Sequence, residues 1–180
     1  AYQSVVKERA PQADIVFDRF HVVQLLLKAI DEIRRDEVRK ATPDEKKSLK
    51  RSRFTLLRNP RHWKPRDHAT ISRVIRANRR LARAWERRFE FDFVWEMPDE
   101  DTARCFLMRW TRSALLSQLE PLRKFARTVR AHMEGILGFF RQGGVTSAPI
   151  EGTNNKIKLA IHRAFGFHKT RPLISMIHLC

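Results

Sequence analysis

Apolar residues recur every three or four positions through most of this chain, which is the spacing of amphipathic helices. Between residues 22 and 33 they are Val22, Leu26, Ile30 and Ile33. From Pro121 to Phe140 they are Leu122, Phe125, Val129, Met133, Ile136, Leu137 and Phe140. A third series follows Asp67, which can cap a helix that bears Ile71, Val74, Ile75, Ala82, Trp85 and Phe89. We therefore expect helices over most of residues 22–141.

Several boundaries of these helices can be predicted from the residues that start or stop a helix. Thr42-Pro43-Asp44-Glu45 has the form of a capping box with proline at the first helical position, and Asn59-Pro60 ends that helix. A further helix is expected around Phe106 to Leu119. Gly143-Gly144 is placed to end the helix that stops near Phe140.

One short apolar run does not have helical spacing. Asp14-Ile15-Val16-Phe17-Asp18 predicts a buried strand, with Asp18 and His21 at its carboxyl end. Ligands gather at that end of the strands in open α/β sheets, so the pair could belong to a site. The alternative is a structural pair, in which the carboxylate orients a buried imidazole.

The stretch from Glu151 onward predicts a helix with one polar and one apolar face. Glu151, Asn155, Lys158 and His162 share the polar face. The apolar face is formed by Ile150, Ile157, Ala160, Ile161 and Ala164. Thr146 or Ser147 could cap this helix, with Pro149 in the first turn. A carboxylate beside an amide and an ammonium group suits a Mg²⁺ site that handles phosphate. An ordinary solvated face is the alternative.

Charge narrows the choice of partner. The 180 residues contain 37 Lys and Arg against 20 Asp and Glu, a net charge of +17, which favours nucleic acid first and an acidic membrane second. The chain has no apolar run of membrane-spanning length and does not open on a signal peptide, so we expect a cytoplasmic, nucleoid-associated protein. Cys105 and Cys180 have neither disulfide nor metal-ligand spacing and receive no role.

The positive charge is concentrated between Arg34 and Glu90, where 20 Lys and Arg stand against seven Asp and Glu. Within it lies the arginine series: Arg73, Arg76, Arg80, Arg83 and Arg87. This series is either a solvated face or a surface that contacts the DNA backbone. Trp85 and Trp110 have core spacing, whereas Trp63, in a basic loop, could stack on an unpaired base or simply pack.

Two long motifs resemble one known family. Glu151-Gly152-Thr153-Asn154-Asn155-Lys156-Ile157-Lys158, followed by the run from His162 to Phe167, resembles the end of the catalytic domain in the ISL-three family of bacterial insertion-sequence transposases. Residues 10–23 resemble that family's P-x-A-x-I-V-x-D-R-F-H-V-V segment. Both motifs occur in the family's order, and the resemblance spans essentially the whole chain.

The resemblance implies a fold. The chain is expected to be mainly α and to form the C-terminal part of an RNase H-like α/β domain with an all-helical insertion, most of the sheet being missing. Residues 1–23 are expected to end the sheet region, 24–145 to form the basic insertion, and 146–180 to include the catalytic helix. Asp18-Arg19-Phe20-His21 resembles the C/D-x-x-H signature that follows the second catalytic aspartate in such enzymes, and is not itself that aspartate.

The resemblance also implies chemistry. The intact DDE enzyme is expected to hold Mg²⁺ or Mn²⁺ with two aspartates and one glutamate, to cleave DNA at the transposon ends, and to join them to target DNA. Glu151 is the implied metal ligand, with Asn155, Lys158, Asp18 and His21 in support. Both aspartates are expected upstream of Ala1, so these 180 residues should be inactive alone.

The expected partner is DNA, with homo-oligomerisation on DNA in the full-length protein and no membrane contact. The expected DNA contacts are the arginine series together with Lys156, Lys158, Arg163, Lys169 and Trp63. Two other functions remain open. One is a basic helical module that binds nucleic acid without cutting it, and the other is a peripheral membrane-surface protein.

Overall fold

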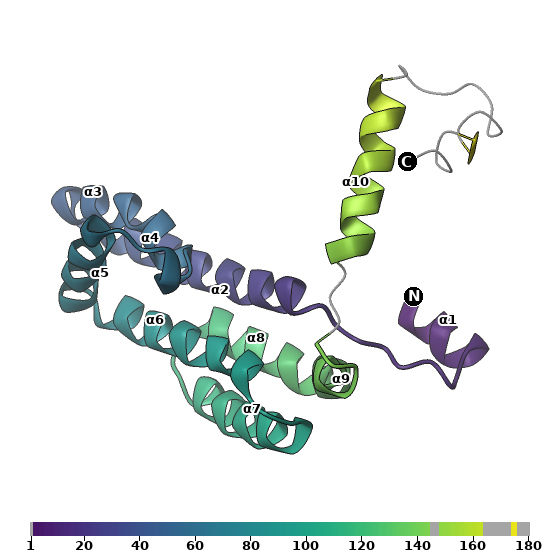
Figure 1. Cartoon of the computed structure of the whole chain (residues 1–180). Coiled ribbons are helices and arrows are strands. Elements are labelled where there is room, and N and C mark those ends of the chain that lie inside the picture. The colour runs from purple at the N-terminus through teal and green to yellow at the C-terminus, as the bar shows by residue number, and fades with distance from the viewer. Residues whose placement is uncertain (1, 145–147, 164–173, 176–180) are drawn as a thin grey trace. The chain divides into compact units, whose positions relative to one another are not determined.

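The computed structural model describes residues 2–144, 148–163 and 174–175. The chain divides into unit 1, residues 1–143, and unit 2, residues 144–180, and each is described by itself. The elements of unit 1 are α1 (Tyr2–Arg9), α2 (Arg19–Lys40), α3 (Pro43–Arg51), α4 (Arg53–Leu57), η1 (Pro60–His62), α5 (Pro65–Ala77), α6 (Arg79–Asp92), η2 (Phe93–Glu96), α7 (Glu100–Leu115), α8 (Glu120–Ala131) and α9 (Met133–Arg141) (Figure 1). Unit 2 contains α10 (Ala148–Arg163).

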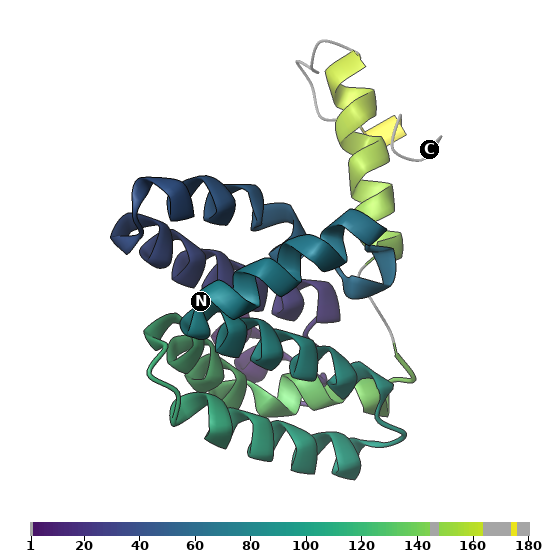
Figure 2. The same ribbon diagram turned by 90° about the vertical axis from the view of Figure 1, so that its left-hand side faces the viewer.

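Helix α2 is the element around which unit 1 packs. It contacts α6 and α8, and α8 in turn packs against α7, so that these helices lie side by side in both views (Figures 1 and 2). The predicted apolar face is confirmed, because Val22, Leu26, Ile30 and Ile33 are all buried. Each of the described helices is too short or too polar to cross a bilayer.

Aromatic side chains fill the centre of unit 1. Phe91 is fully buried and makes edge contacts with Trp110 and Phe125, at centroid distances of 4.8 and 5.3 Å. The indole nitrogen of Trp110 donates to the backbone oxygen of Arg87 at 2.9 Å, so its polar atom is satisfied inside the core. The prediction that Trp85 and Trp110 pack against the core is confirmed.

The predicted strand at residues 14–18 is wrong, because the described residues contain no strand and this segment is irregular. A strand is stable only if neighbouring strands accept and donate its backbone hydrogen bonds. Here the segment lies on α9, where the N–H of Phe17 donates to the oxygen of Gly135 at 2.8 Å. The described residues are therefore helical, and the RNase H-like part of the fold stays a prediction.

Two long helices expected from apolar spacing are each broken. The helix after Asp67 is α5 and α6, separated at Asn78 with φ −138° and ψ 104°, and α5 begins at Pro65, before Asp67. The helix from Pro121 to Phe140 is α8 and α9, separated at His132 with φ −120° and ψ 21°. The apolar period continues across both breaks, so spacing alone cannot reveal them.

The predicted capping residues are confirmed at two helix ends, whereas the predicted lengths of several helices are wrong. The capping box of Thr42 and Glu45 starts α3 as expected, although that helix ends at Arg51 and α4 follows a kink at Ser52. Gly143 and Gly144 have φ values of 64° and 84°, the left-handed conformation that favours glycine after a helix. Helix α7 begins at Glu100 rather than near Phe106, because Asp99 caps it by accepting from the N–H of Thr102.

Candidate catalytic helix and nucleic-acid interface

Helix α10 contains the motif with the proposed catalytic glutamate. The prediction of a helix is confirmed, with Pro149 and Glu151 in its first turn. Asn155 and Lys158 are exposed, whereas Ile157 and Ile161 are half-buried, which agrees with one polar and one apolar face. The side chains of Glu151, His162 and Arg163 lie outside the described set, as do all of Thr146, Ser147 and Lys169.

The described residues do not by themselves fit a centre for two metal ions. Within residues 2–144, 148–163 and 174–175, no three His, Cys, Asp or Glu side chains are close enough to hold a metal. Carboxylate and amide oxygens such as those of Glu151 and Asn155 are of the type that Mg²⁺ prefers, but one carboxylate is too few. Metal binding by Glu151 therefore stays a prediction.

Asp18 and His21 lie at the start of α2 rather than at the end of a strand. Asp18 is the N-cap of the helix and accepts from the N–H of Phe20 at 2.6 Å. His21 is exposed, so the alternative of a buried imidazole is wrong. Because Asp18 and Glu151 belong to different units, their proximity stays a prediction.

The arginine series is not one continuous cationic face. Arg73 and Arg76 lie on α5, and the other members lie on α6, beyond the break at Asn78. Arg80 pairs with the buried carboxylate of Glu37 at 2.8 Å, and Arg87 pairs with Glu90 at 3.0 Å. Glu37 also accepts from the side-chain amide of Asn78 at 2.9 Å, so Arg80 takes part in holding α2 and α6 together.

The remaining members of the series are available to a phosphate backbone. Arg73, Arg76 and Arg83 are exposed, and none pairs with a carboxylate in the described part of the chain. Helix α3 adds exposed cations at Lys47, Lys50 and Arg51, which sequence reasoning missed. Their spacing of three and four residues could have identified them as one basic face.

Trp63 is less free than a loop position suggested. Its ring stacks on Trp85 with a centroid distance of 5.8 Å and an interplanar angle of 25°, and meets His68 edge-on at 5.1 Å. The side chain is half-buried and packs against the core. One face of the indole is thus occupied by protein, and base stacking by Trp63 stays a prediction.

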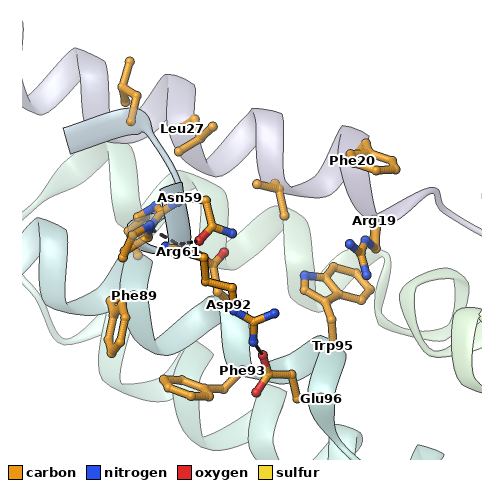
Figure 3. A pocket seen from close by; sticks show the side chains of 14 residues that line it. Arg19, Phe20, Leu27, Asn59, Arg61, Phe89, Asp92, Phe93, Trp95 and Glu96 are labelled. Atoms are coloured by element: carbon orange, nitrogen blue, oxygen red, sulfur yellow. Dashed lines mark hydrogen bonds and ion pairs between the residues drawn. The ribbon is translucent and has the colours of Figure 1, made fainter. Parts of the chain in front are cut away.

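A cavity of about 480 Å³ lies between the start of α2 and the segment formed by η1, the end of α6 and η2 (Figure 3). Arg88 lines it with only 2% of its surface exposed, and pairs with Asp92 at 3.2 Å. Burial lowers the pKa of Arg88 and raises the pKa of Asp92, although each charge partly offsets the other's shift. Sequence reasoning missed this cavity because its walls come from residues far apart along the chain.

Basic helices followed by a helix with a Glu-Gly-Thr-Asn-Asn-Lys-Ile-Lys motif are the features that resemble a transposase. The model of the ISL3 family of DDE transposases, described as transposase, matches residues 1–177. The chain belongs to this family, as its motifs predicted.

Curated relatives agree with that assignment. A transposase for the insertion sequence element IS1001 from Bordetella parapertussis is 31% identical over 170 residues, which cover 93% of this chain and 42% of that protein. A transposase for the element IS1557 from Mycobacterium tuberculosis is 27% identical over 97% of this chain and 44% of its own length. The chain thus spans less than half the length of these relatives. No solved structure matches it.

Proposed function

We propose that this chain is the C-terminal part of a DDE transposase that cleaves DNA at the ends of an insertion sequence and joins them to target DNA. The observation that supports it best is the position of the motif acid: Glu151 lies in the first turn of α10, ahead of the exposed residues Asn155 and Lys158. The match to the transposase family covers residues 1–177 and so includes Glu151, which supports the proposal.

The position of Glu151 suits an ionised carboxylate. Unsatisfied N–H groups and the helix dipole give the first turn a partial positive charge, which favours a negative side chain there. Asn155 and Lys158 follow about one and two turns later, where an amide and an ammonium group could position a phosphate.

Glu151 requires partners in this role. A divalent metal, when bound, stabilises charge on the attacking and leaving oxygens of a phosphodiester. We propose that the two aspartates needed to complete such a site lie in the part of the relatives' length that this chain does not span. On this proposal the 180 residues alone bind DNA without cleaving it.

Unit 1 contributes the DNA-binding surface in this proposal. Arg73, Arg76 and Arg83, with the cations of α3, are exposed and free of carboxylate partners in the described part of the chain, so they can neutralise phosphates. Contacts of this kind position a duplex and read no sequence. The affinity of the chain for DNA should therefore fall steeply as the salt concentration is raised.

The decisive experiment uses the full-length protein with Glu151→Gln and, as a matched control, Glu32→Gln on the exposed side of α2. Strand transfer of labelled transposon ends into a plasmid is measured with Mg²⁺, alongside DNA binding. We expect Glu151→Gln to lower strand transfer by at least about 100-fold with binding unchanged, and Glu32→Gln to change neither. Equal activity of both variants would remove Glu151 from the mechanism, and a wild-type protein that binds DNA but never cuts it would favour the non-enzymatic module.

A further inference from the structure

The cavity beside α2 brings together exposed aromatic rings from separate parts of the chain. Phe20 at the start of α2 is 52% exposed, and Phe89 and Phe93, at the end of α6 and the start of η2, are 37% and 41% exposed. All of them line the same cavity (Figure 3). Single exposed apolar side chains are common on proteins, but several around one cavity indicate a binding surface.

The same cavity is lined by Arg88, a charged side chain that is buried away from solvent. Arg88 is almost fully buried; its Nη1 lies 3.2 Å from a carboxylate oxygen of Asp92, and its Nε has no hydrogen-bond acceptor among the described residues. In the part of the chain that the structure describes, Asp92 is the only ion-pair partner of Arg88, and burial raises the pKa of that carboxyl group. A buried guanidinium group with an unmet donor destabilises the folded state. Its presence at a cavity therefore indicates a role in function.

Two further cations, Arg19 and Arg61, line the cavity. Arg19 stands over the ring of Phe20, 5.3 Å from its centroid, and Arg61 pairs with Glu96 at the opposite wall (Figure 3). Together with Arg88, the lining contains three arginines against the two acids Asp92 and Glu96. The combination of flat apolar rings and excess positive charge matches a ligand that is both flat and anionic.

We propose that this cavity binds one unpaired nucleotide of a DNA strand, with its base against Phe20 and its phosphate near Arg19. The inference rests on the proposed function, because the single strand would come from the DNA that the transposase binds. A volume of about 480 Å³ lies within the range of pockets for ligands of this size. A paired base cannot enter without leaving its stack, so the cavity should distinguish single-stranded from duplex DNA.

The chain itself provides a matched control. Arg53 and Phe54 repeat the Arg-Phe pair of residues 19 and 20, with the guanidinium 5.8 Å from the ring centroid. Phe54 is 71% exposed and does not line the cavity. Phe20→Ala and Phe54→Ala therefore remove equivalent exposed rings, one at the cavity and one elsewhere.

The test measures the affinity of the 180-residue chain for a fluorescent single-stranded thymidine oligonucleotide and for a blunt duplex at the same salt. We expect Phe20→Ala to weaken single-strand binding about tenfold and to leave duplex binding unchanged, because base stacking on an aromatic ring is lost. Phe54→Ala should change neither affinity. Arg88→Met combined with Asp92→Leu removes the buried ion pair as a unit, so it should leave the protein folded, and it should also weaken single-strand binding.

Equal single-strand affinities for Phe20→Ala and Phe54→Ala would overturn the proposal, as would a parallel loss of duplex binding in Phe20→Ala. In that case salt-dependent duplex binding by wild type would leave the proposed transposase function intact. A wild-type chain that binds neither form of DNA would count against both.

Discussion

Unit 1 and helix α10 differ in how much of their surface they bury. Among the residues that the structure describes, the buried apolar core, including Leu26, Leu81 and Leu107, lies in unit 1. In α10 the described side chains are at most half-buried, and Leu159 is 52% exposed. Most helical stability in proteins comes from packing of an apolar face, so unit 1 should be stable by itself while α10 depends on further contacts. By itself, the helix with the proposed catalytic acid should thus be less stable than the unit with the proposed DNA-binding cations.

The two regions also use their cations differently. In unit 1 several arginines are engaged in ion pairs: Arg104 joins Glu100 and Glu134, and Arg141 joins the same two acids. In α10, Lys156 and Lys158 are exposed and form no ion pair in the described part of the chain. A count of positive residues therefore overstates the charge that unit 1 can offer to DNA.

The largest predicted difference is between leucines of the two regions. Leu26→Ala removes a fully buried side chain from α2 and should lower the free energy of unfolding by about 2–5 kcal/mol, because it loses transfer energy and leaves a cavity. Leu159→Ala in α10 should change it by less than about 0.5 kcal/mol. Urea unfolding of the 180-residue chain measures both, with tryptophan fluorescence reporting unit 1 and the helical circular dichroism signal including α10. A loss of about 2 kcal/mol or more in Leu159→Ala would show that α10 is packed as firmly as unit 1.

The sequence predicts most helices because apolar periodicity and capping residues are local signals. Thr42 and Glu45 form their box within one turn, and the apolar face of α2 can be read directly from its spacing. The break at His132 has no glycine, proline or preferred capping residue to mark it, whereas Asn78 is a preferred N-cap residue and accepts from the N–H of Leu81 in α6, a local signal that apolar spacing alone does not show. Asn78 ends α5 while its side chain donates to Glu37, which lies 41 residues earlier. Such a partner is set by tertiary structure.

The two regions can also be compared by substituting a glycine in each, Gly135 in α9 and Gly152 in α10. A Cβ on Gly135 would lie 2.3 Å from the ring of Phe17 and 3.0 Å from the backbone oxygen of Ile15, whereas one on Gly152 would meet nothing within 4 Å. Gly135→Ala should therefore lower the free energy of unfolding by about 1–3 kcal/mol, because the docked segment must move. Gly152→Ala should stabilise α10 by up to about 1 kcal/mol, since alanine favours the helix.

Thermal unfolding measures the loss in Gly135→Ala, and circular dichroism measures any gain of helix in Gly152→Ala. Gly138→Ala is a useful intermediate case, because its Cβ would approach the Val16 side chain at 3.0 Å, a contact that can relax more easily. An unchanged melting temperature for Gly135→Ala would mean that residues 15–17 are not held on α9 in solution.

The candidate site was predictable only where it is local in sequence. The helix that contains the Glu151 motif follows from consecutive residues, and the family match spans it. The pairing of Arg80 with Glu37, and the cavity between Phe20 and Phe93, join residues that are distant along the chain. Sequence spacing treats each arginine of a series alike, whereas folding commits some to carboxylates and leaves others free.

The smallest predicted effect is a change in the stability of unit 1 as the pH is lowered. Asp67 accepts from the N–H of Lys64, which chiefly lowers its pKa, and from Thr55, with Arg58 beside it. A carboxylate whose pKa is lowered by folding stabilises the protein above its unfolded pKa of about 3.9, and that contribution is lost as the pH falls through the folded pKa. Wild type should therefore be more stable than Asp67→Asn at pH 6, and the difference should shrink below about pH 4.

Urea midpoints at a series of pH values test this prediction, with Asp14→Asn as the control because Asp14 is exposed in the segment before α2. The expected effect belongs to unit 1, since Asp67 holds the start of α5 against Thr55 in α4. Amide exchange of α10 should be the same in wild type and Asp67→Asn at every pH. A stability difference that persists unchanged into acid would mean that the ionised carboxylate is not what holds the start of α5.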